Sequence, residues 1–167
     1  MTEKIVYRDS YIVVKKKTTK DKTNYTILKF RPSVAIVAIT NNDKVILIRQ
    51  YREPLEKEII EIPAGVKAKG DETALQTAKR ELMEETGYTA KNWIELGRLS
   101  IEPNIVSTQP FVFLAIDATR KPQLKIEENI KHSEYTWEEI EALIRTKQLT
   151  NSFSIAALYA TKVHLRR

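Results

Sequence analysis

The chain has 167 residues, 42% of them hydrophobic, which is enough for one substantial core and predicts a single globular unit. It contains no cysteine, which excludes disulfide scaffolds, thiolate zinc sites and thiol nucleophiles, and it has only two histidines. Any bound metal must therefore be held mainly by oxygen, which favours magnesium or manganese over zinc. The net charge of +6 comes mostly from scattered lysines, and we interpret it as a solvated surface rather than a nucleic-acid groove.

The sequence also bears on where the protein is found. It has no run of about 18 or more apolar residues, the length that a membrane-spanning helix needs. Its first residues lack the apolar stretch and the small-residue cleavage site of a secretory signal. We therefore expect a cytoplasmic protein that has no membrane partner.

Short runs that alternate in polarity or are rich in β-branched residues predict most of the strands. The polar stretch at residues 18–23 predicts a hairpin loop, and Asn41-Asn42-Asp43 predicts a turn after a buried central strand. The expected strands cover residues 4–8, 11–17, 24–30, 33–40, 44–50, 58–62, 93–100 and 111–116.

Three amphipathic segments predict helices. Asp71 can cap the first helix, and Gly87 can end it after Thr86; Thr136 can cap the second. The expected helices cover residues 71–86, residues 137–147, and a last segment that begins at 151 or 152. Mixed strands with few helices indicate an α+β fold or a sheet sandwiched between helices.

The first helix carries the run Arg80-Glu81-Leu82-Met83-Glu84-Glu85. At about 100° per residue, Glu81 and Glu85 fall on the edge of the apolar stripe or within it. They are one turn apart, so their oxygens can converge on a cation, while Glu84 lies further round and could bind a second ion. The neighbouring carboxylates repel one another, and we expect Arg80 and a divalent ion to compensate them. An exposed glutamate-rich helix is the alternative interpretation.

Residues 65–88 resemble the signature of the Nudix hydrolase family: a Gly, a spaced Glu, then Arg-Glu-apolar-any-Glu-Glu-any-Gly-apolar. The spacing from Arg80 places the isolated Glu of the signature at Glu72, and the loop at residues 66–71 is one residue longer than the pattern. The resemblance implies a Nudix-like α/β/α sandwich with a mixed sheet. It further implies that Glu81 and Glu85 ligate Mg²⁺, with Mn²⁺ as a possible substitute, that Glu84 is a supporting ligand, and that Arg80 orients the carboxylates.

The segments Arg49-Gln50-Tyr51-Arg52 and Glu61-Ile62-Pro63-Ala64-Gly65 resemble those of the ADP-ribose pyrophosphatases within this family. The resemblance implies that Arg49 and Arg52 contact the substrate, with Arg52 favoured as the phosphate or ribose contact. It implies that Glu61 helps to shape the site, and that the Ala64 carbonyl can ligate a metal. Arginines that merely end a strand are the alternative, since isolated arginines commonly have no partner of consequence.

Two loops are also assigned by resemblance. Pro103, sixteen residues after Gly87, is similar to the proline that marks ADP-ribose-hydrolysing members. The surrounding residues, 101–107, depart from the Gly-Phe-Ser-like loop usual there, which leaves a different sugar at that end of the substrate as an alternative. In the loop before the last strand, Glu128 is the favoured base or metal ligand, with Glu127 as its substitute.

The resemblance divides one structural unit into two parts. Residues 1–31 resemble the small N-terminal antiparallel sheet through which ADP-ribose pyrophosphatases dimerise, and residues 32–167 form the Nudix domain. We therefore expect a homodimer by analogy. The predicted function is Mg²⁺-dependent hydrolysis of ADP-ribose or a related nucleoside diphosphate sugar to AMP and a sugar phosphate. The alternatives are hydrolysis of a dinucleotide or nucleoside triphosphate, and a non-catalytic nucleotide- or RNA-binding module.

Overall fold

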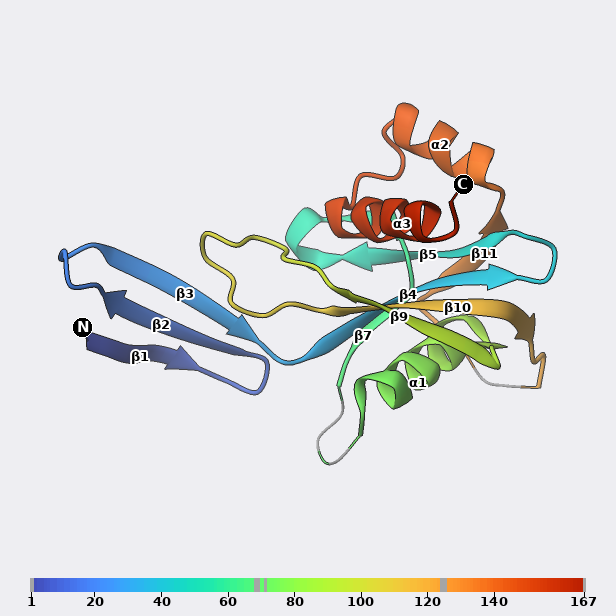
Figure 1. Cartoon of the computed structure of the whole chain (residues 1–167). Helices are drawn as coiled ribbons and strands as arrows, with labels where there is room; N and C mark the ends of the chain where they lie inside the picture. The colour runs from blue at the N-terminus through green and yellow to red at the C-terminus, as the bar shows by residue number, and fades with distance from the viewer. Residues whose placement is uncertain (1, 68–69, 71, 124–125, 167) are drawn as a thin grey trace.

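The computed structural model of the chain describes residues 2–67, 70, 72–123 and 126–166. Its first part is a three-stranded antiparallel sheet, which projects from the rest of the molecule (Figure 1). The strands of this N-terminal sheet are β1 (Thr2–Arg8), β2 (Ile12–Thr18) and β3 (Asn24–Phe30), in that spatial order. The expectation of a small N-terminal antiparallel sheet is thereby confirmed.

The remaining described strands form one mixed sheet. They are β4 (Ser33–Thr40), β5 (Val45–Arg52), β6 (Lys57–Glu61), β7 (Ala64–Val66), β8 (Tyr88–Thr89), β9 (Asn92–Arg98), β10 (Phe111–Arg120) and β11 (Lys131–Tyr135), with a short 3-10 helix, η1 (Glu53–Leu55), after β5. The spatial order is β11-β5-β4-β10-β8, and β6 pairs with β5, β7 with β4 and β9 with β10. β4 and β10 are parallel, whereas the other pairings are antiparallel.

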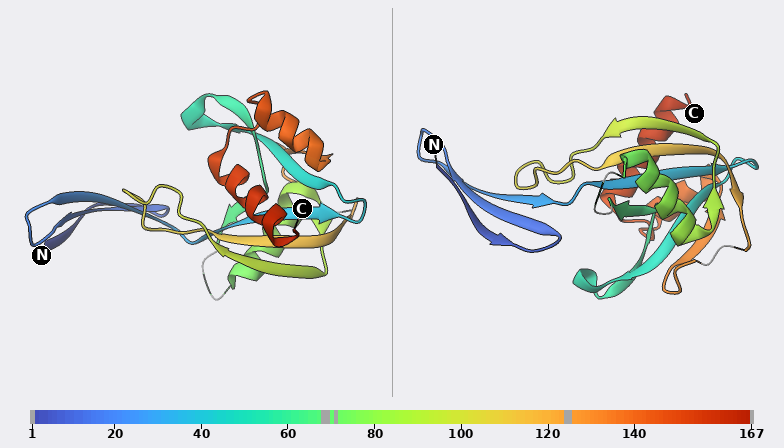
Figure 2. Two further views of the ribbon diagram at one scale, coloured as in Figure 1. Left: turned by 45° about the horizontal axis from the view of Figure 1, so that its top comes forward. Right: turned by 90° about the horizontal axis from the view of Figure 1, so that it is seen from below.

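Helices cover both faces of this mixed sheet (Figures 1 and 2). α1 (Ala74–Thr86) lies on one face, and α2 (Trp137–Arg145) and α3 (Ser152–His164) lie on the other. The arrangement is the expected α/β/α sandwich of an α+β fold. Within the described residues, no helix is long and apolar enough to cross a membrane.

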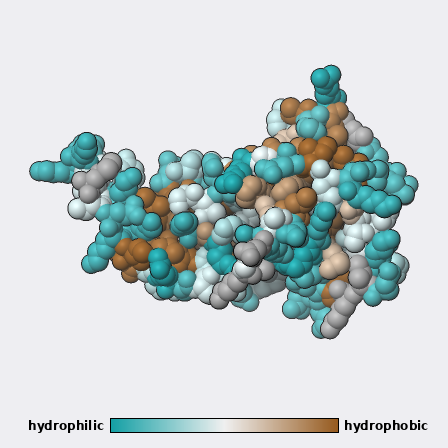
Figure 3. All heavy atoms as spheres, turned by 60° about the horizontal axis from the view of Figure 1, so that its bottom comes forward, coloured by the Kyte–Doolittle hydropathy of each residue, from teal (hydrophilic) through white to brown (hydrophobic). Residues whose placement is uncertain are grey.

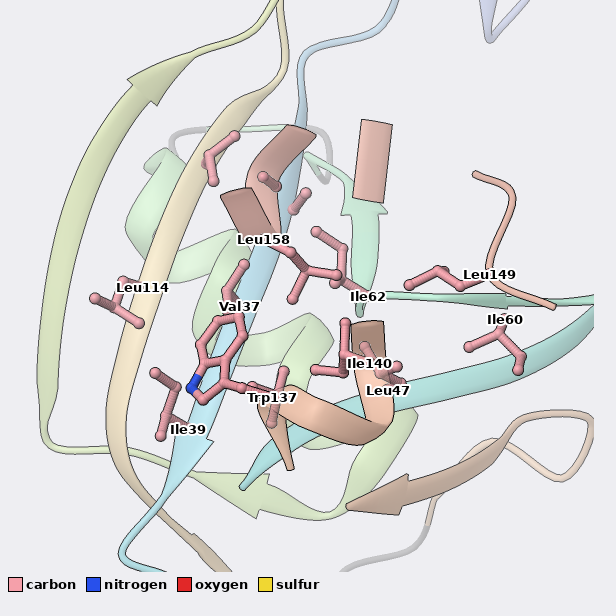
Figure 4. Packing of buried hydrophobic residues seen from close by; sticks show 14 residues of the cluster. Val37, Ile39, Leu47, Ile60, Ile62, Leu114, Trp137, Ile140, Leu149 and Leu158 are labelled. Carbon is pink, nitrogen blue, oxygen red and sulfur yellow. The ribbon is translucent and has the colours of Figure 1, made fainter. Parts of the chain in front are cut away.

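The central strand β4 supplies both cores, because its side chains point alternately to the two faces. Val34, Ile36 and Ala38 pack with Ala78 and Leu82 of α1. The intervening residues of β4 pack with residues of α2 and α3; Figure 4 shows Val37 and Ile39 of this second cluster beside Trp137, Ile140 and Leu158. A strand that is buried on both faces explains the continuous apolar run that predicted it.

The structure corrects several predicted boundaries. α1 is capped by Thr73, whose side chain accepts a hydrogen bond from Gln76 N in a capping box, and begins at Ala74. Asp71, the predicted cap, lies outside the described residues. β7 and β8 were not predicted, because each has three residues or fewer and pairs with a strand distant in sequence. β11 is the last strand that the resemblance placed after Glu128, without bounds. β10 continues beyond residue 116, where the prediction ended it. Its register with β4 shifts between Ala115 and Ala118, and Asp117 within this irregularity has φ 56°.

A loop between β9 and β10 joins the two sheets. Leu28 of β3 accepts a hydrogen bond from Ser107 N at 2.9 Å and donates one to Ile105 O at 2.7 Å. Phe30 N donates to Thr108 Oγ1 at 2.8 Å. The loop therefore lies along β3 and attaches the N-terminal sheet to the main domain.

Leu82 is fully buried between α1 and β4, so truncating it tests how strongly this contact holds the helix. We expect Leu82→Ala to lower the free energy of unfolding by about 2–5 kcal/mol, through lost burial and a residual cavity. Leu55→Ala is the control, because Leu55 is exposed on η1 and its truncation should change stability by less than about 0.5 kcal/mol. Urea unfolding followed by circular dichroism measures both, and equal effects would contradict the packing described for α1.

Candidate active site

The carboxylates of Glu81 and Glu85 lie in the contact between α1 and the main sheet. The two residues are 8% and 4% exposed, although charged residues are seldom buried without a partner. Glu85 Oε2 accepts a hydrogen bond from Ala64 N of β7 at 3.0 Å. The side chains thus turn toward the sheet, as their placement on the edge of the apolar stripe predicted.

Gly65 provides the space for the Glu81 carboxylate. A Cβ atom added to Gly65 would overlap the carboxyl group of Glu81. The backbone of β7 therefore approaches α1 more closely than any residue with a side chain would permit. This close contact explains why the signature begins with a glycine, since any larger residue would displace the Glu81 carboxylate.

Arg80 lies at the centre of an acidic cluster that contains Glu72, Glu81 and Glu84. Its Nη1 atom is 2.9 Å from Glu81 Oε1 and 2.8 Å from Glu84 Oε2, and its Nε atom is 3.0 Å from Glu72 Oε1. Nη2 donates to Val66 O at 3.2 Å, which ties α1 to β7. Glu72 reaches Arg80 even though the loop before it is one residue longer than the family pattern. Arg80 therefore supports the carboxylates on either side of it.

The electrostatics of this region favour a cation. The pKa of Glu85 is raised to about 8, mainly by burial and also by the charges of Glu81 and Glu127, while the hydrogen bond from Ala64 N and the charge of Arg52 act in the opposite direction. Burial also raises the pKa of Glu81 above its usual value, despite the attraction of Arg80. Raised pKa values in two neighbouring buried acids indicate that positive charge is lacking around them. A bound divalent ion would supply that charge.

The chemistry of these residues fits a hard divalent cation, since all the donors are oxygens. In the described part of the chain, however, no three acidic or histidine side chains converge into an assembled metal cluster. The physical reason is that Glu81 and Glu84 face Arg80, while Glu85 faces the Ala64 amide. The contact with Arg80 is made by Glu81 Oε1, and a carboxylate can bind a cation through its other oxygen while that contact is kept.

Arg52 of β5 and Glu61 of β6 form an ion pair along the same face of the two paired strands, in which Glu61 lies opposite Ile48 and Arg52 lies opposite Lys57. Arg52 Nε donates to Glu61 Oε2 at 2.8 Å, and Arg52 Nη2 is 2.7 Å from the same oxygen. Gln50 Nε2 also donates to this oxygen at 3.2 Å. Arg52 lowers the pKa of Glu85 through its charge, so the ion pair lies within electrostatic reach of the α1 carboxylates.

Two other predicted substrate residues are placed differently. Arg49 is three positions from Arg52, and side chains alternate along β5, so the two arginines point to opposite faces. Pro103 lines a cavity beside the N-terminal sheet, together with Tyr25 and Ile27 of β3. The structure thus brings Arg52 and Glu61 together, and it brings neither Arg49 nor Pro103 to this ion pair within one chain.

The loop before β11 contributes further acids. Glu127 N donates to Glu84 O at 2.9 Å, and a cleft beside α1 is lined by Glu84, Ile126, Glu127, Glu128 and Asn129. The charge of Glu127 raises the pKa of both Glu81 and Glu85. Glu127, the predicted substitute, is therefore near both α1 carboxylates and is tied to α1 through its backbone.

Comparison with known proteins gives the family. A model of the NUDIX domain matches residues 29–159. The chain is 36% identical over 135 residues to an ADP-ribose pyrophosphatase of Bacillus subtilis (strain 168), and 34% identical over 135 residues to a methanol dehydrogenase activator of Bacillus methanolicus. Each match covers 79% of this chain and 72% of the relative.

A solved crystal structure of an ADP compounds hydrolase has the same fold. It superposes with a TM-score of 0.80 at 22% sequence identity, and the match covers 99% of this chain and 92% of the other. The family match spans the mixed sheet, α1 with its acidic cluster, α2, and α3 as far as residue 159. The chain belongs to the Nudix hydrolase family and is similar to the ADP-ribose pyrophosphatases within it.

Proposed function

We propose that the protein hydrolyses the pyrophosphate bond of ADP-ribose, or of a related nucleoside diphosphate sugar, in a Mg²⁺-dependent reaction that gives AMP and a sugar phosphate. The observation that carries the proposal is the buried pair Glu81 and Glu85, whose raised pKa values mark a deficit of positive charge beside the Arg52–Glu61 ion pair. A relative that is named ADP-ribose pyrophosphatase supports the choice of substrate.

Glu81, Glu85 and the Ala64 carbonyl would hold the metal, with Glu84 as a supporting ligand, and Mn²⁺ could replace Mg²⁺. When bound, the ion supplies charge neutralisation for the pyrophosphate oxygens and lowers the pKa of water. Arg80 holds the carboxylates in place through its ion pairs.

The chain's own side chains then bind the substrate and take up a proton. Arg52 binds a phosphate oxygen, because a guanidinium presents several N–H donors to an anion. A carboxylate oxygen of Glu128 or Glu127 accepts a proton from the water that attacks phosphorus. Glu128 is the favoured base, and Glu127, whose N–H donates to Glu84 O at 2.9 Å, is its substitute.

A substrate panel tests the reaction. With Mg²⁺ present, we expect the purified protein to hydrolyse ADP-ribose in preference to other nucleotide sugars, dinucleotides and nucleoside triphosphates, with AMP and ribose phosphate separated by anion-exchange chromatography. Glu85→Gln keeps the size of the side chain but removes its charge, and should lower kcat by at least roughly a hundredfold, since metal stabilisation is worth several kcal/mol. Preference for a triphosphate would overturn the substrate, and full turnover by Glu85→Gln would overturn the role of Glu85.

The raised pKa of Glu85 predicts how pH changes the effect of metal on stability. Between a pH of about 4.5 and about 8, the metal-free folded protein keeps a proton on Glu85 that the unfolded chain has released. The folded state then binds more protons, so its stability falls as the pH rises through this range. A cation binds the ionised carboxylate, so Mg²⁺ should raise Tm more at about pH 8.5 than at about pH 6. Thermal unfolding in EDTA and in MgCl₂ measures the difference, and Glu85→Gln should abolish most of it; equal stabilisation of the wild type at both pH values would contradict the prediction.

We further propose that the N-terminal sheet mediates homodimerisation. It carries large apolar side chains that are exposed in the single chain: Ile5, Val6, Tyr7, Tyr11, Tyr25 and Phe30. Figure 3 shows hydrophobic atoms gathered on this projecting part of the surface. Exposed apolar patches of this kind are typical of protein interfaces. Because Pro103 lies against the same sheet, its proposed contact with substrate would be made in the site of the second copy.

Ile5→Glu tests the dimer. Ile5 lies opposite Lys15, which also pairs with Glu3, so a glutamate there faces an opposite charge across the strands while apolar surface is removed. Light scattering after gel filtration should give twice the chain mass of 19.3 kDa for the wild type, and a shift toward the single-chain mass for Ile5→Glu. Ile144→Glu is the control, because Ile144 is exposed on α2, away from the N-terminal sheet, and it should leave the mass unchanged. A wild-type protein that is monomeric at all concentrations would contradict the proposal.

A further inference from the structure

Side chains from β5 and from the start of α3 hold the carboxylate of Glu61, the last residue of β6. The residue is 7% exposed, and its Oε2 atom accepts hydrogen bonds from Arg52 and Gln50 of β5. Its Oε1 atom accepts a hydrogen bond of 2.6 Å from Asn151 Nδ2, at the start of α3. The two oxygens of the carboxylate thus face different partners, which leaves the group little freedom to rotate.

We propose that Asn151 is a positioning residue, which fixes the Glu61 carboxylate so that Arg52 is oriented toward the phosphate of the substrate. The inference rests on the proposed function, because it assigns Arg52 to substrate binding. Asn151 is 90 residues from Glu61 in the chain, and the sequence alone suggests for it only a role as a helix cap.

The side chain of Asn151 serves two purposes with its two polar atoms. Its Oδ1 atom accepts a hydrogen bond from Ser154 N at 2.7 Å, which caps α3, while Nδ2 donates to Glu61. Asp, Ser and Thr also cap helices well, but ionised Asp has no donor, and the hydroxyls of Ser and Thr lie closer to the backbone. Among the good cap residues, Asn alone offers a carbonyl acceptor and an NH₂ donor at the same reach.

A second contact from the first turn of α3 holds the same segment of β6. Ser154 Oγ, which is buried, accepts a hydrogen bond from Ile62 N at 3.1 Å. The N-terminal end of a helix also favours a nearby negative charge. The first turn of α3 therefore fixes both the Glu61 side chain and the following peptide, just before the residues that contact α1.

Loss of the Asn151 donor should therefore act on Arg52 through Glu61. With Oε1 released, the Glu61 carboxylate can rotate, and the geometry in which Arg52 Nε and Nη2 meet Oε2 is no longer enforced. Arg52 would then spend less time in the orientation that binds an anion. The expected consequence is weaker substrate binding with an intact fold.

Two variants separate positioning from capping. Asn151→Asp keeps a good cap but replaces the donor with a negative charge beside Glu61, and Asn151→Ser keeps a cap that cannot reach Glu61. For hydrolysis of ADP-ribose with Mg²⁺, we expect KM to rise by about tenfold or more for Asn151→Asp and by a smaller factor for Asn151→Ser. We expect kcat to change much less, and Kd for ADP-ribose in EDTA to rise in parallel with KM.

Thr136→Ala and a double-mutant cycle are the controls. Thr136 caps α2 through the same kind of side-chain contact, so Thr136→Ala should lower Tm without raising KM. In the background of Arg52→Ala, Asn151→Asp should add little to KM, because both changes remove the same interaction. An unchanged KM and Kd in both Asn151 variants, or independent effects of Asn151→Asp and Arg52→Ala, would overturn the inference.

A measurement without substrate distinguishes this inference from the proposed function. In ¹⁵N-labelled protein, the Nε–H signal of Arg52, assigned by its absence in Arg52→Lys, reports the hydrogen bond to Glu61. We expect it to shift and to exchange faster with water in Asn151→Asp. If the signal responds while the wild type hydrolyses no nucleotide in the panel, the positioning is correct and the function is wrong. If the wild type hydrolyses ADP-ribose but the signal is unchanged, the positioning is wrong.

Discussion

Two carboxylates buried between α1 and β7 impose the constraint to which the surrounding structure responds. Removing an ionised carboxylate from water costs several kcal/mol unless charges or hydrogen bonds compensate it. The Ala64 amide compensates Glu85 in part, and Arg80 compensates Glu81. Gly65 allows the backbone to approach closely enough for this arrangement. These contacts do not fully offset the cost of burial, because the pKa values of both acids stay above their usual range. Positive charge nearby would lower them.

The short segment between Glu61 and Val66 connects this constraint to the whole sandwich. α3 holds its beginning through Asn151 and Ser154. β4 holds its middle, since Ile36 N donates to Pro63 O at 2.8 Å. α1 holds its end through contacts to Ala64 and Val66. Both helical layers and the central strand therefore fix one segment, which is how a rigid scaffold keeps functional groups in register.

The sequence predicted the elements that depend on local pattern. The apolar run of β4 and the hairpin of β2 and β3 follow from periodicity and a polar turn, and the end of α1 follows from Gly87, which has φ 72°. The missed elements have no such local signal. β7 has three residues and β8 has two, and they are strands only because β4 and β10 lie beside them. The cap of α1 was misplaced because both Asp71 and Thr73 are acceptable cap residues.

The sequence by itself determined the family, the sandwich fold and the acidic helix, because the spacing of Arg80, Glu81, Glu84 and Glu85 and the alternation of the strands are local properties of the chain. Only the tertiary structure decided which distant residues join that helix. It placed Arg52 on the face of β5 that meets Glu61, Arg49 on the opposite face, Pro103 against the N-terminal sheet, and Asn151 against Glu61. The physical reason is that strand register and helix docking set these contacts, and both depend on packing across the whole core rather than on neighbours in sequence.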